Sequence, residues 1–535
     1  MNFLERKVVF TLLIILFFLS GRFYPALASS EVSLQERIEK LEKIMQDQQR
    51  SLESLKSELE NQKAAEETNR QDQEKLSTLE KKVEAVESVK TKMEQEDAKL
   101  QTDKKKRAIA YWQDGFNIET PDQQFRLNMA GVLQLDYRQF SSDRSASSFD
   151  IRRARYDMRG SLYRDEFEHL FRLQIEMADE PYLRNAYWMF KFRPEFNFQL
   201  GQFKVPAGGA DFLTEEAQIN FIEYATETPV SPFFDRGINI HSFFLNGKVQ
   251  TNLAVVTGVG VDRDVGQGDY DNHKDYAGRL LFIPFKDTAI PWLKGVHFGG
   301  SFQDGLQTIK TKRGETSNRT ENYESLWFRW TKDYVDLEER KRYGGEVHWL
   351  YGPFSMSYEF NRVQWEDITV YKEVYTTVPT VGGSIAKTQR VFDFCLPDEY
   401  HADVHQVWVS YFLTGEEKQF QDIFFAWRQP KPKQNFSLKQ GTWGAWEILA
   451  RYSYKDASEE LFNSGILEGS RSGYSVTGGL RWIWNPKVRL MLDVNYLKSA
   501  EGKGIIVERT DKGASPSRSY KDSETAVLMR FILTP

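Results

Sequence analysis

Basic side chains recur at alternate positions in one stretch of the sequence, FDIRRARYDMRGSL at residues 149–162. In a β-strand every second side chain points to the same face, and neighbours on that face lie about 7 Å apart. Guanidinium groups stay charged at any working pH and bind phosphate or carboxylate groups through paired N–H donors, so such a row could pass anions along a channel wall. The basic residues predicted to line this path are Arg153, Arg155, Arg159, Arg172, Lys191 and Arg193. The alternative is that they are wall charges neutralised by Asp157, Glu168 and Glu176.

Little else in the sequence suggests covalent chemistry. The seven histidines are scattered, and only His401 and His405 have the spacing of two metal ligands on a helix. No Gly-x-Ser-x-Gly elbow, phosphate-binding loop or dinucleotide fingerprint occurs in a suitable context. The single cysteine, Cys395, excludes a disulfide framework and a Cys-cluster metal site. We therefore expect no enzyme activity, no cofactor and no metal site, with a surface metal at the two histidines as the weaker alternative.

The composition limits the class of protein. The 535 residues carry 71 Lys and Arg against 77 Asp and Glu, a formal net charge of -6, and the mean hydropathy is -0.57. Without a basic excess, a nucleic-acid-binding protein is not expected. After residue 30 no segment offers the roughly 20 apolar residues that a membrane-spanning helix needs. The length allows two or three soluble domains or one very large sheet.

Residues 1–28 are predicted to be a secretory signal peptide. A charged start, an apolar run over Val8–Leu19 and small residues at Ala26 and Ala28 fit such a signal, which is too short for a stable membrane anchor. A short membrane anchor is the alternative. We expect cleavage after Ala28 and export from a bacterial-type cytoplasm.

Residues 29–107 are predicted to form a periplasmic α-helical coiled coil that ends in a basic hinge. The stripe from Leu34 to Leu59 is apolar except at Gln48, and its members are spaced alternately four and three apart. Residues 62–75 are polar, and the pattern resumes beyond them with a shift of phase. A lone helix would expose this stripe, so we expect self-association, as a dimer or a trimer. The alternative is a helix that folds back on its own barrel or is partly disordered.

After Ala108 the period of the hydrophobic pattern changes to two. Between Phe125 and Tyr137 apolar residues alternate with mainly polar ones, and the same alternation recurs in 167–178 and 487–497. The segments are about as long as tilted membrane-crossing strands. Soluble β-sandwiches also alternate, but the signal peptide, the strand lengths and the aromatic strand ends favour an all-β transmembrane barrel over residues 108–535.

The spacing of turns and loops predicts 16 antiparallel strands, because outer-membrane barrels have short turns at one end and long loops at the other. Placing every short turn on the periplasmic side moves 322–330 into a loop. The remaining strands begin near residues 125, 150, 167, 184, 196, 237, 249, 276, 294, 343, 354, 404, 444, 474, 487 and 523. Long loops are expected at 138–149, 205–236, 258–275, 303–342, 363–403, 455–473 and 498–522. The stretch 413–443 is either a long periplasmic connection or two more strands, so 18 is the fallback. A barrel of this size encloses an aqueous lumen.

The segment 205–236 is the longest early loop, and we expect it to fold inward and constrict the pore. Gly208 and Gly209 would permit the bend, and Tyr224 lies in the same segment. A surface cap is the alternative.

Several stretches resemble the phosphate-selective porin O and P family, in the order in which that family has them. They include LRNAYWMFKFRPEFNFQLGQFKVP, SYFLTGEE, GAWEILARYSYKDA and GLRWIWNPKVRLMLDVNY, and the resemblance covers roughly residues 112–533. It implies a 16-stranded trimeric outer-membrane channel for small anions, whose Arg-rich second strand is matched here at Arg152, Arg153 and Arg155. The sequence departs from the family at Ala207–Gly208, where Phe-Gly is usual, and at Tyr224, where Arg is usual.

These observations predict an outer-membrane porin of a Gram-negative-type bacterium that lets small hydrophilic solutes diffuse passively, with a preference for anions such as phosphate. The expected partners are small inorganic or organic anions, outer-membrane lipid and further copies of the chain in a trimer, with no nucleic acid. The alternatives are a general non-selective porin, and a structural envelope anchor that carries a periplasmic coiled coil.

Overall fold

The structure, a computed structural model, describes residues 26–64, 72–106, 108–141, 147–163, 167–178, 181–225, 232–258, 260, 273–310, 317–332, 334–380, 383–420, 426–509 and 517–534. The chain divides into two compact units, and the division falls between Arg107 and Ala108. The predicted signal peptide lies outside the described residues up to residue 25.

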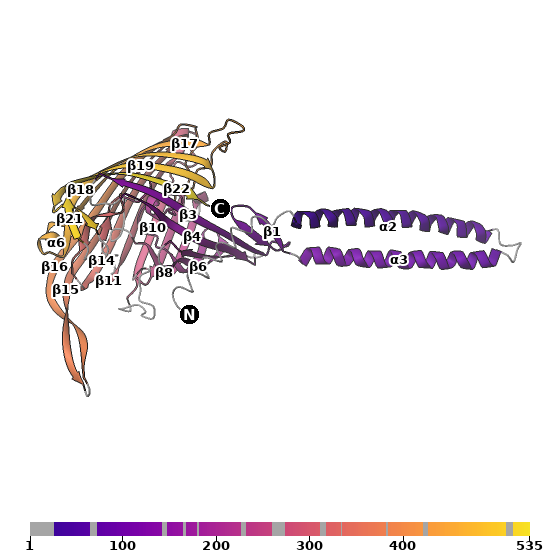
Figure 1. Cartoon of the computed structure of the whole chain (residues 1–535), viewed down its shortest axis with the longest axis horizontal. Coiled ribbons are helices and arrows are strands. Elements are labelled where there is room, and N and C mark those ends of the chain that lie inside the picture. The colour runs from indigo at the N-terminus through magenta and orange to yellow at the C-terminus, as the bar shows by residue number, and fades with distance from the viewer. Residues whose placement is uncertain are drawn as a thin grey trace. The chain divides into compact units, whose positions relative to one another are not determined.

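The first unit contains two helices, α2 (Ala26–Ala64) and α3 (Asp72–Lys106), which lie side by side (Figure 1). The two helices contact each other within one chain: Leu52 is buried, and Lys56 Nζ on α2 lies 3.0 Å from Glu87 Oε1 on α3. Helices are therefore confirmed here, while self-association through a coiled coil stays a prediction. Among the described residues, no helix combines the length and the hydropathy that crossing a membrane would require.

The second unit is a closed antiparallel barrel with 16 wall strands, as predicted. The last strand pairs with the first, Leu528 standing opposite Arg138, and this pairing closes the ring. The wall strands are β3 (Phe125–Phe140), β4 (Ser148–Leu162), β5 (Glu168–Glu176), β6 (Tyr182–Arg193), β7 (Phe196–Lys204), β8 (Phe234–Phe244), β9 (Val249–Val256), β10 (Asp275–Phe282), β11 (Val296–Lys310), β14 (Tyr334–Tyr351), β15 (Phe354–Thr380), β16 (Gly383–Phe412), β17 (Ala445–Ala457), β18 (Leu467–Asn485), β19 (Val488–Gly502) and β22 (Ser523–Leu533). A hairpin of β1 (Ile109–Trp112) and β2 (Phe116–Glu119) extends the sheet beside β3.

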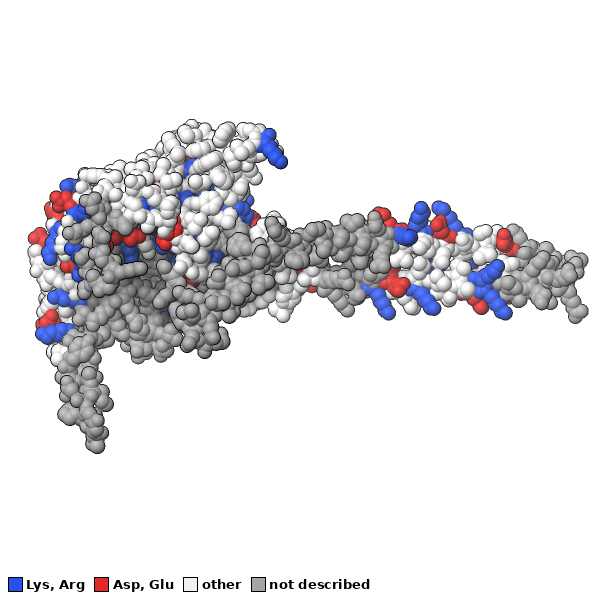
Figure 2. Space-filling view, viewed as in Figure 1, with Lys and Arg blue, Asp and Glu red and all other residues white. Residues whose placement is uncertain are grey.

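The two-residue period places apolar side chains outside and polar side chains inside the barrel. On β3, Leu135 is 40% exposed, whereas its neighbours Gln134 and Asp136 are 0% and 2% exposed. The wall over β17, β19 and β22 is almost free of charge in Figure 2, and charged side chains gather toward α6 (Glu459–Asn463) and β21 (Ser517–Lys521). An uncharged outer wall is what contact with lipid requires.

Aromatic side chains border this wall near strand ends. On β6, the ring of Phe190 lies 6.2 Å from that of Trp188 and 6.2 Å from that of Phe192. On β18, the rings of Trp482 and Trp484 lie 5.1 Å apart. Aromatic girdles of this kind occur at the interfaces of outer-membrane barrels.

Two of the predicted long loops are largely strand. The stretch 363–403 forms the outer parts of β15 and β16, which pair as far as Thr380 and Gly383. In the stretch 303–342, β11 continues to Lys310 and β14 begins at Tyr334. These predictions were wrong because the polar residues of these stretches occupy only one face of the strands. The other face, with Val335, Trp365 and Val370, is buried in an apolar core, and the backbone ladder continues.

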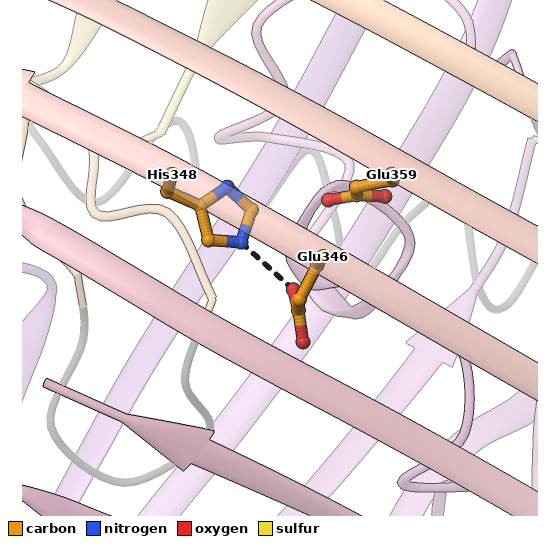
Figure 3. Close-up of side chains that lie close together, drawn as sticks. All are labelled: Glu346, His348 and Glu359. Atoms are coloured by element: carbon orange, nitrogen blue, oxygen red, sulfur yellow. Dashed lines mark hydrogen bonds and ion pairs between the residues drawn. The ribbon is translucent and has the colours of Figure 1, made fainter.

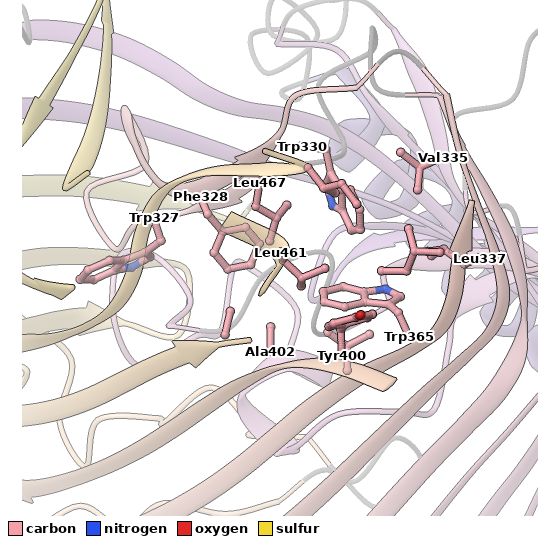
Figure 4. Packing of buried hydrophobic residues seen from close by; sticks show 14 of the residues in the cluster. Trp327, Phe328, Trp330, Val335, Leu337, Trp365, Tyr400, Ala402, Leu461 and Leu467 are labelled. Carbon is pink, nitrogen blue, oxygen red and sulfur yellow. The ribbon is translucent and has the colours of Figure 1, made fainter. Parts of the chain in front are cut away.

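A second, smaller sheet lies at the long-loop end of the barrel. It contains β12 (Ser317–Arg319), β13 (Ser325–Trp330), β20 (Ile505–Arg509) and β21, and β13 also pairs with the outer end of β18. The segment 322–330 is thus outside the wall, as predicted, but it contributes the strand β13 of this sheet. Trp327, Phe328 and Trp330 pack there into an apolar core with side chains of β14, β15 and β16 (Figure 4).

The connection 413–443 adds no wall strand in its described part, and this settles the count at 16 rather than 18. It contains two isolated bridges, Phe420 with Trp427 and Ser437 with Thr442. Trp427 is fully buried and packs with Trp408 of the wall. The connection therefore reaches into the barrel from the short-turn end.

Candidate functional site

Residues 205–225, here called the lumen segment, lie inside the barrel and cross it. Near one end of the segment, the backbone N–H groups of Ala210 and Asp211 donate to Glu346 of β14 and Glu359 of β15, at 2.8 Å each. Five residues on, Glu216 binds Arg155 of β4, with 2.7 Å between Oε2 and Nη1. In a ring of sixteen strands β14 and β15 stand opposite β4 and β5. The segment therefore spans the lumen from wall to wall.

Both glycines predicted for the bend have a structural role. Gly208 has φ +97°, a conformation that residues with a side chain rarely adopt, and its N–H donates to Ser301 Oγ at 3.0 Å. A Cβ atom on Gly209 would fall 2.2 Å from the carboxyl carbon of Glu359. Gly209 precedes the short helix α4 (Ala210–Leu213), so its missing side chain lets this turn lie against the wall.

Three residues of the predicted arginine row are buried: Arg153, Arg155 and Arg172. Arg153 donates to Gln134 at 2.8 Å, and carboxylates neutralise the other two. Arg155 donates to Glu176 and to Glu216, at 2.7 Å each. Arg172 donates to both oxygens of Asp157, at 2.9 and 2.6 Å, and to Glu215 at 2.6 Å. Asp157 and Glu176 were expected as partners; the two glutamates of the lumen segment were not.

The remaining three residues of the predicted path lie in more open positions. The Arg159 side chain is 54% exposed and donates to Asp157 at 2.6 Å. Lys191 is partly exposed and lies 3.1 Å from Glu168, one of the three carboxylates expected to neutralise the wall. Arg193 is exposed at the end of β6 beside the short turn to β7. The structure thus separates the row into a buried, paired group and an accessible group.

Four guanidinium groups surround one carboxylate of the lumen segment, in a group that we call the Glu223 cluster: Arg138, Arg152, Arg153, Arg530, Asp136 and Glu223. Glu223 Oε1 accepts from Arg530 at 2.7 Å, from Arg138 at 3.1 Å and from Arg152 at 3.2 Å. Its other oxygen lies 3.9 Å from Arg153 Nη2. Asp136 also accepts from Arg530 and Arg138, at 2.7 Å each.

Burial by itself would raise the pKa of Glu223, but the surrounding guanidinium groups, Arg152 and Arg530 foremost, hold that pKa well below its usual range. The carboxylate is therefore charged. The four positive groups face two buried carboxylates and, 3.6 Å from Arg138, the half-exposed carboxylate of Glu324. Among the other buried charged residues in the described part of the chain, eleven are basic and twelve are acidic, so the charges outside the cluster are nearly balanced.

Tyr224, the departure from the family pattern noted above, is buried within the lumen segment. Its hydroxyl donates to the carbonyl of Thr214 at 2.7 Å and lies 3.3 Å from Lys204 Nζ. The Lys204 ammonium also lies over the rings of Phe212 and Tyr224, at 4.7 and 5.1 Å. Tyr224 thus holds the two halves of the segment together beside a basic residue of β7.

Glu346, His348 and Glu359 bring potential metal-ligating atoms within 4.8 Å of one another (Figure 3). Those atoms already have partners of other kinds. Glu346 accepts from Arg279 at 2.6 and 2.8 Å and from His348 at 2.8 Å, and Glu359 accepts from Gln406 at 2.9 Å. Because a guanidinium occupies the face that a cation would need, the group fits a metal poorly. It serves instead to hold the start of α4.

His401 and His405 lie on the strand β16, not on a helix. In a strand, residues four apart are about 13 Å apart, so their spacing cannot make a two-ligand metal site. His405 Nδ1 lies 3.0 Å from the Tyr358 hydroxyl, and His401 Nδ1 lies 3.2 Å from Ser458 Oγ.

Sequence reasoning missed the second inserted element, in the connection 413–443. Asp211 of the lumen segment accepts from the indoles of Trp427 and Trp408, at 2.5 and 2.7 Å. The Phe420 ring stacks on Trp427 at 4.2 Å, and Lys418 Nζ lies 2.6 Å from Glu447. Aromatic residues in a polar connection were the available signal, because a surface loop gives them nothing to pack against.

Several solved structures are similar to this chain at low sequence identity. OmpT, an outer membrane protein of Vibrio cholerae, has 10% identity and a TM-score of 0.42, over 77% of this chain and 98% of that one. An anion-selective porin from Comamonas acidovorans has 11% identity and a TM-score of 0.44, over 77% and 100%. The outer membrane channel DcaP of Acinetobacter baumannii has 9% identity and a TM-score of 0.41, over 78% and 99%. No curated protein matches the chain in sequence.

The family model described as phosphate-selective porin O and P matches residues 127–395 and 397–520, which is most of the barrel. The match includes the Arg-rich β4, the lumen segment and the connection that carries Trp427. With a closed barrel, an uncharged outer wall and a polar interior, the chain belongs to the phosphate-selective porin O and P family and is an outer-membrane porin.

Proposed function

We propose that this porin conducts small anions passively, with phosphate among them, down their concentration gradients. The observation that carries the proposal is the excess of guanidinium groups in the Glu223 cluster, inside a lumen whose other buried charges are nearly balanced. Fixed positive charge in a narrow pore raises the local concentration of anions and excludes cations. No covalent step is involved.

The proposed path leads from the long-loop end past the Glu223 cluster, then along the face that carries Arg153, Arg155 and Arg172. It leaves by the accessible group at Arg159, Lys191 and Arg193, of which Lys191 and Arg193 lie toward the short turns. The lumen segment, with Gly208, Gly209 and Tyr224, forms the constriction. The short turns face the periplasm, as is general for such barrels.

A general, weakly selective porin is the second candidate. The equal numbers of buried acidic and basic residues favour it, because paired charges screen each other and leave little net field in the pore. In that case the arginines stabilise the lumen segment and do not select the solute.

We further propose that α2 and α3 lie in the periplasm and promote self-association into a trimer. Leu41 and Ile44 on α2 and Val89 on α3 remain 37%, 39% and 40% exposed after the two helices have paired. These exposed apolar side chains could pack against the same surface on another copy of the helix pair. An envelope anchor would need the same hairpin but no conductance.

Reversal potentials in planar bilayers test the proposed function. The purified porin in a KCl gradient should give a reversal potential on the anion-selective side. Arg159→Glu should move it toward cations, because Arg159 is exposed to the lumen and only singly paired. The matched control is Lys341→Glu, which changes a basic residue at an outward position of β14. A wild-type potential near zero would favour the general porin, and folded protein without conductance would favour the anchor.

A further inference from the structure

We propose that Glu223 is a built-in anion surrogate. Its carboxylate occupies the position that an oxyanion takes on the guanidinium groups of the Glu223 cluster, and a solute anion binds there by displacing it. This inference rests on the proposed anion conduction. It adds that competition from the Glu223 carboxylate limits the affinity of the site for solute anions.

The chemistry of the cluster is that of an oxyanion receptor. Guanidinium groups from three neighbouring wall strands, β3, β4 and β22, converge on one carboxylate oxygen, at 2.7 to 3.2 Å. The four guanidinium groups outnumber the carboxylates of Glu223, Asp136 and the half-exposed Glu324, so the site stays positive with Glu223 in place. Arg138 Nε is buried without a hydrogen bond, and so is Glu223 Oε2. A phosphate or sulfate has more acceptor oxygens than a carboxylate and could satisfy more of these donors.

The Glu223 carboxylate, and not the arginines, is the group that a solute anion can displace, because the two are attached to different parts of the chain. Arg138 and Arg530 stand on wall strands whose backbones are fixed by ladders on both sides, and Arg152 lies at the register shift in the ladder between β3 and β4. Glu223 stands on the lumen segment, which has no ladder of its own and is held by side chains. Its position also depends on hydrogen bonds at Ile222, whose N–H donates to Asp493 at 2.6 Å and whose carbonyl accepts from Arg530.

A route to the cluster exists at Arg152. Its side chain is 15% exposed, whereas those of Arg138 and Arg530 are 1% and 0% exposed. The Arg152 guanidinium also stacks on the ring of Tyr323, 3.8 Å from its centroid, in the segment that covers the cluster from the long-loop end. An anion arriving from that end would meet Arg152 first and the Glu223 carboxylate next.

The experiment compares Glu223→Gln with Glu324→Gln in the full-length porin. The amide keeps an oxygen that can accept from Arg530 but removes the competing charge. The control removes a carboxylate that also lies near Arg138, at 3.6 Å, but is 50% exposed. The measurement is the concentration of inorganic phosphate that halves the single-channel chloride current, with denaturant unfolding midpoints to verify that both variants fold.

Glu223→Gln should lower the half-blocking concentration on the order of tenfold, because a like charge about 4 Å from the bound anion is removed. Glu324→Gln should change it less than about twofold, as expected for a screened surface charge. An unchanged half-blocking concentration in Glu223→Gln, or an equal effect of both variants, would overturn the inference and leave Glu223 as a structural contact. The proposed function fails separately, through a wild-type reversal potential that shows no anion preference.

Discussion

Replacing Arg155 by methionine tests whether charge pairs hold the lumen segment in place. The Arg155 side chain is 1% exposed and makes contacts of 2.7 Å to Glu176 and to Glu216. Removing one partner of a buried ion pair typically costs about 3 to 5 kcal/mol, because a charge is left buried without compensation. Both carboxylates keep other donors here: Arg184 for Glu216, and the N–H of Ala154 at 2.8 Å for Glu176. We therefore expect the lower end of the range, about 3 kcal/mol.

Hydrogen exchange of the lumen segment measures this loss directly. Amides that exchange by opening of residues 210–225 should exchange about 150-fold faster in Arg155→Met, which corresponds to about 3 kcal/mol. Arg155→Met with Glu216→Gln should recover part of the protection, because the uncompensated charge is removed together with its partner. Amides of β17 provide the internal control and should not change. Unchanged exchange in 210–225, or a double variant whose loss equals the sum of the single losses, would refute the role of this pair.

Two further perturbations address the bend and the helices. Gly209→Val should displace the lumen segment from Glu359, at a cost of about 1 to 3 kcal/mol, and raise the single-channel conductance. The control is Gly345→Val, because a Cβ atom at Gly345 meets nothing within 4 Å. Equal conductance in the two variants would contradict the expectation. Deleting 31–100 should lower the oligomeric mass in detergent, measured by light scattering, while the heat-dependent mobility of the folded barrel persists; an unchanged mass would rule out self-association through α2 and α3.

The wall of the barrel could be predicted from the sequence because its determinants are local. A two-residue period marks each strand, and neighbouring strands follow one another along the chain, so strand order needs no long-range information. All sixteen predicted strands have a counterpart in the wall. The errors are at strand ends, as in β15 and β16, where many polar residues suggest a loop although the backbone pairing continues and one face is buried.

The two-residue period also predicted that the arginine row lies on the inward face of the wall. It did not predict which of these arginines are paired with carboxylates. Whether Arg155 is free or paired depends on Glu216, which is 61 residues away and reaches it only because the lumen segment crosses the barrel. The four arginines around Glu223 come from β3, β4 and β22, and the closure of the ring brings the last of these beside the first. The sequence by itself therefore determined a polar, arginine-bearing interior. Only the tertiary structure decided which charges face a solute, because ion pairing depends on distances between residues far apart in the chain.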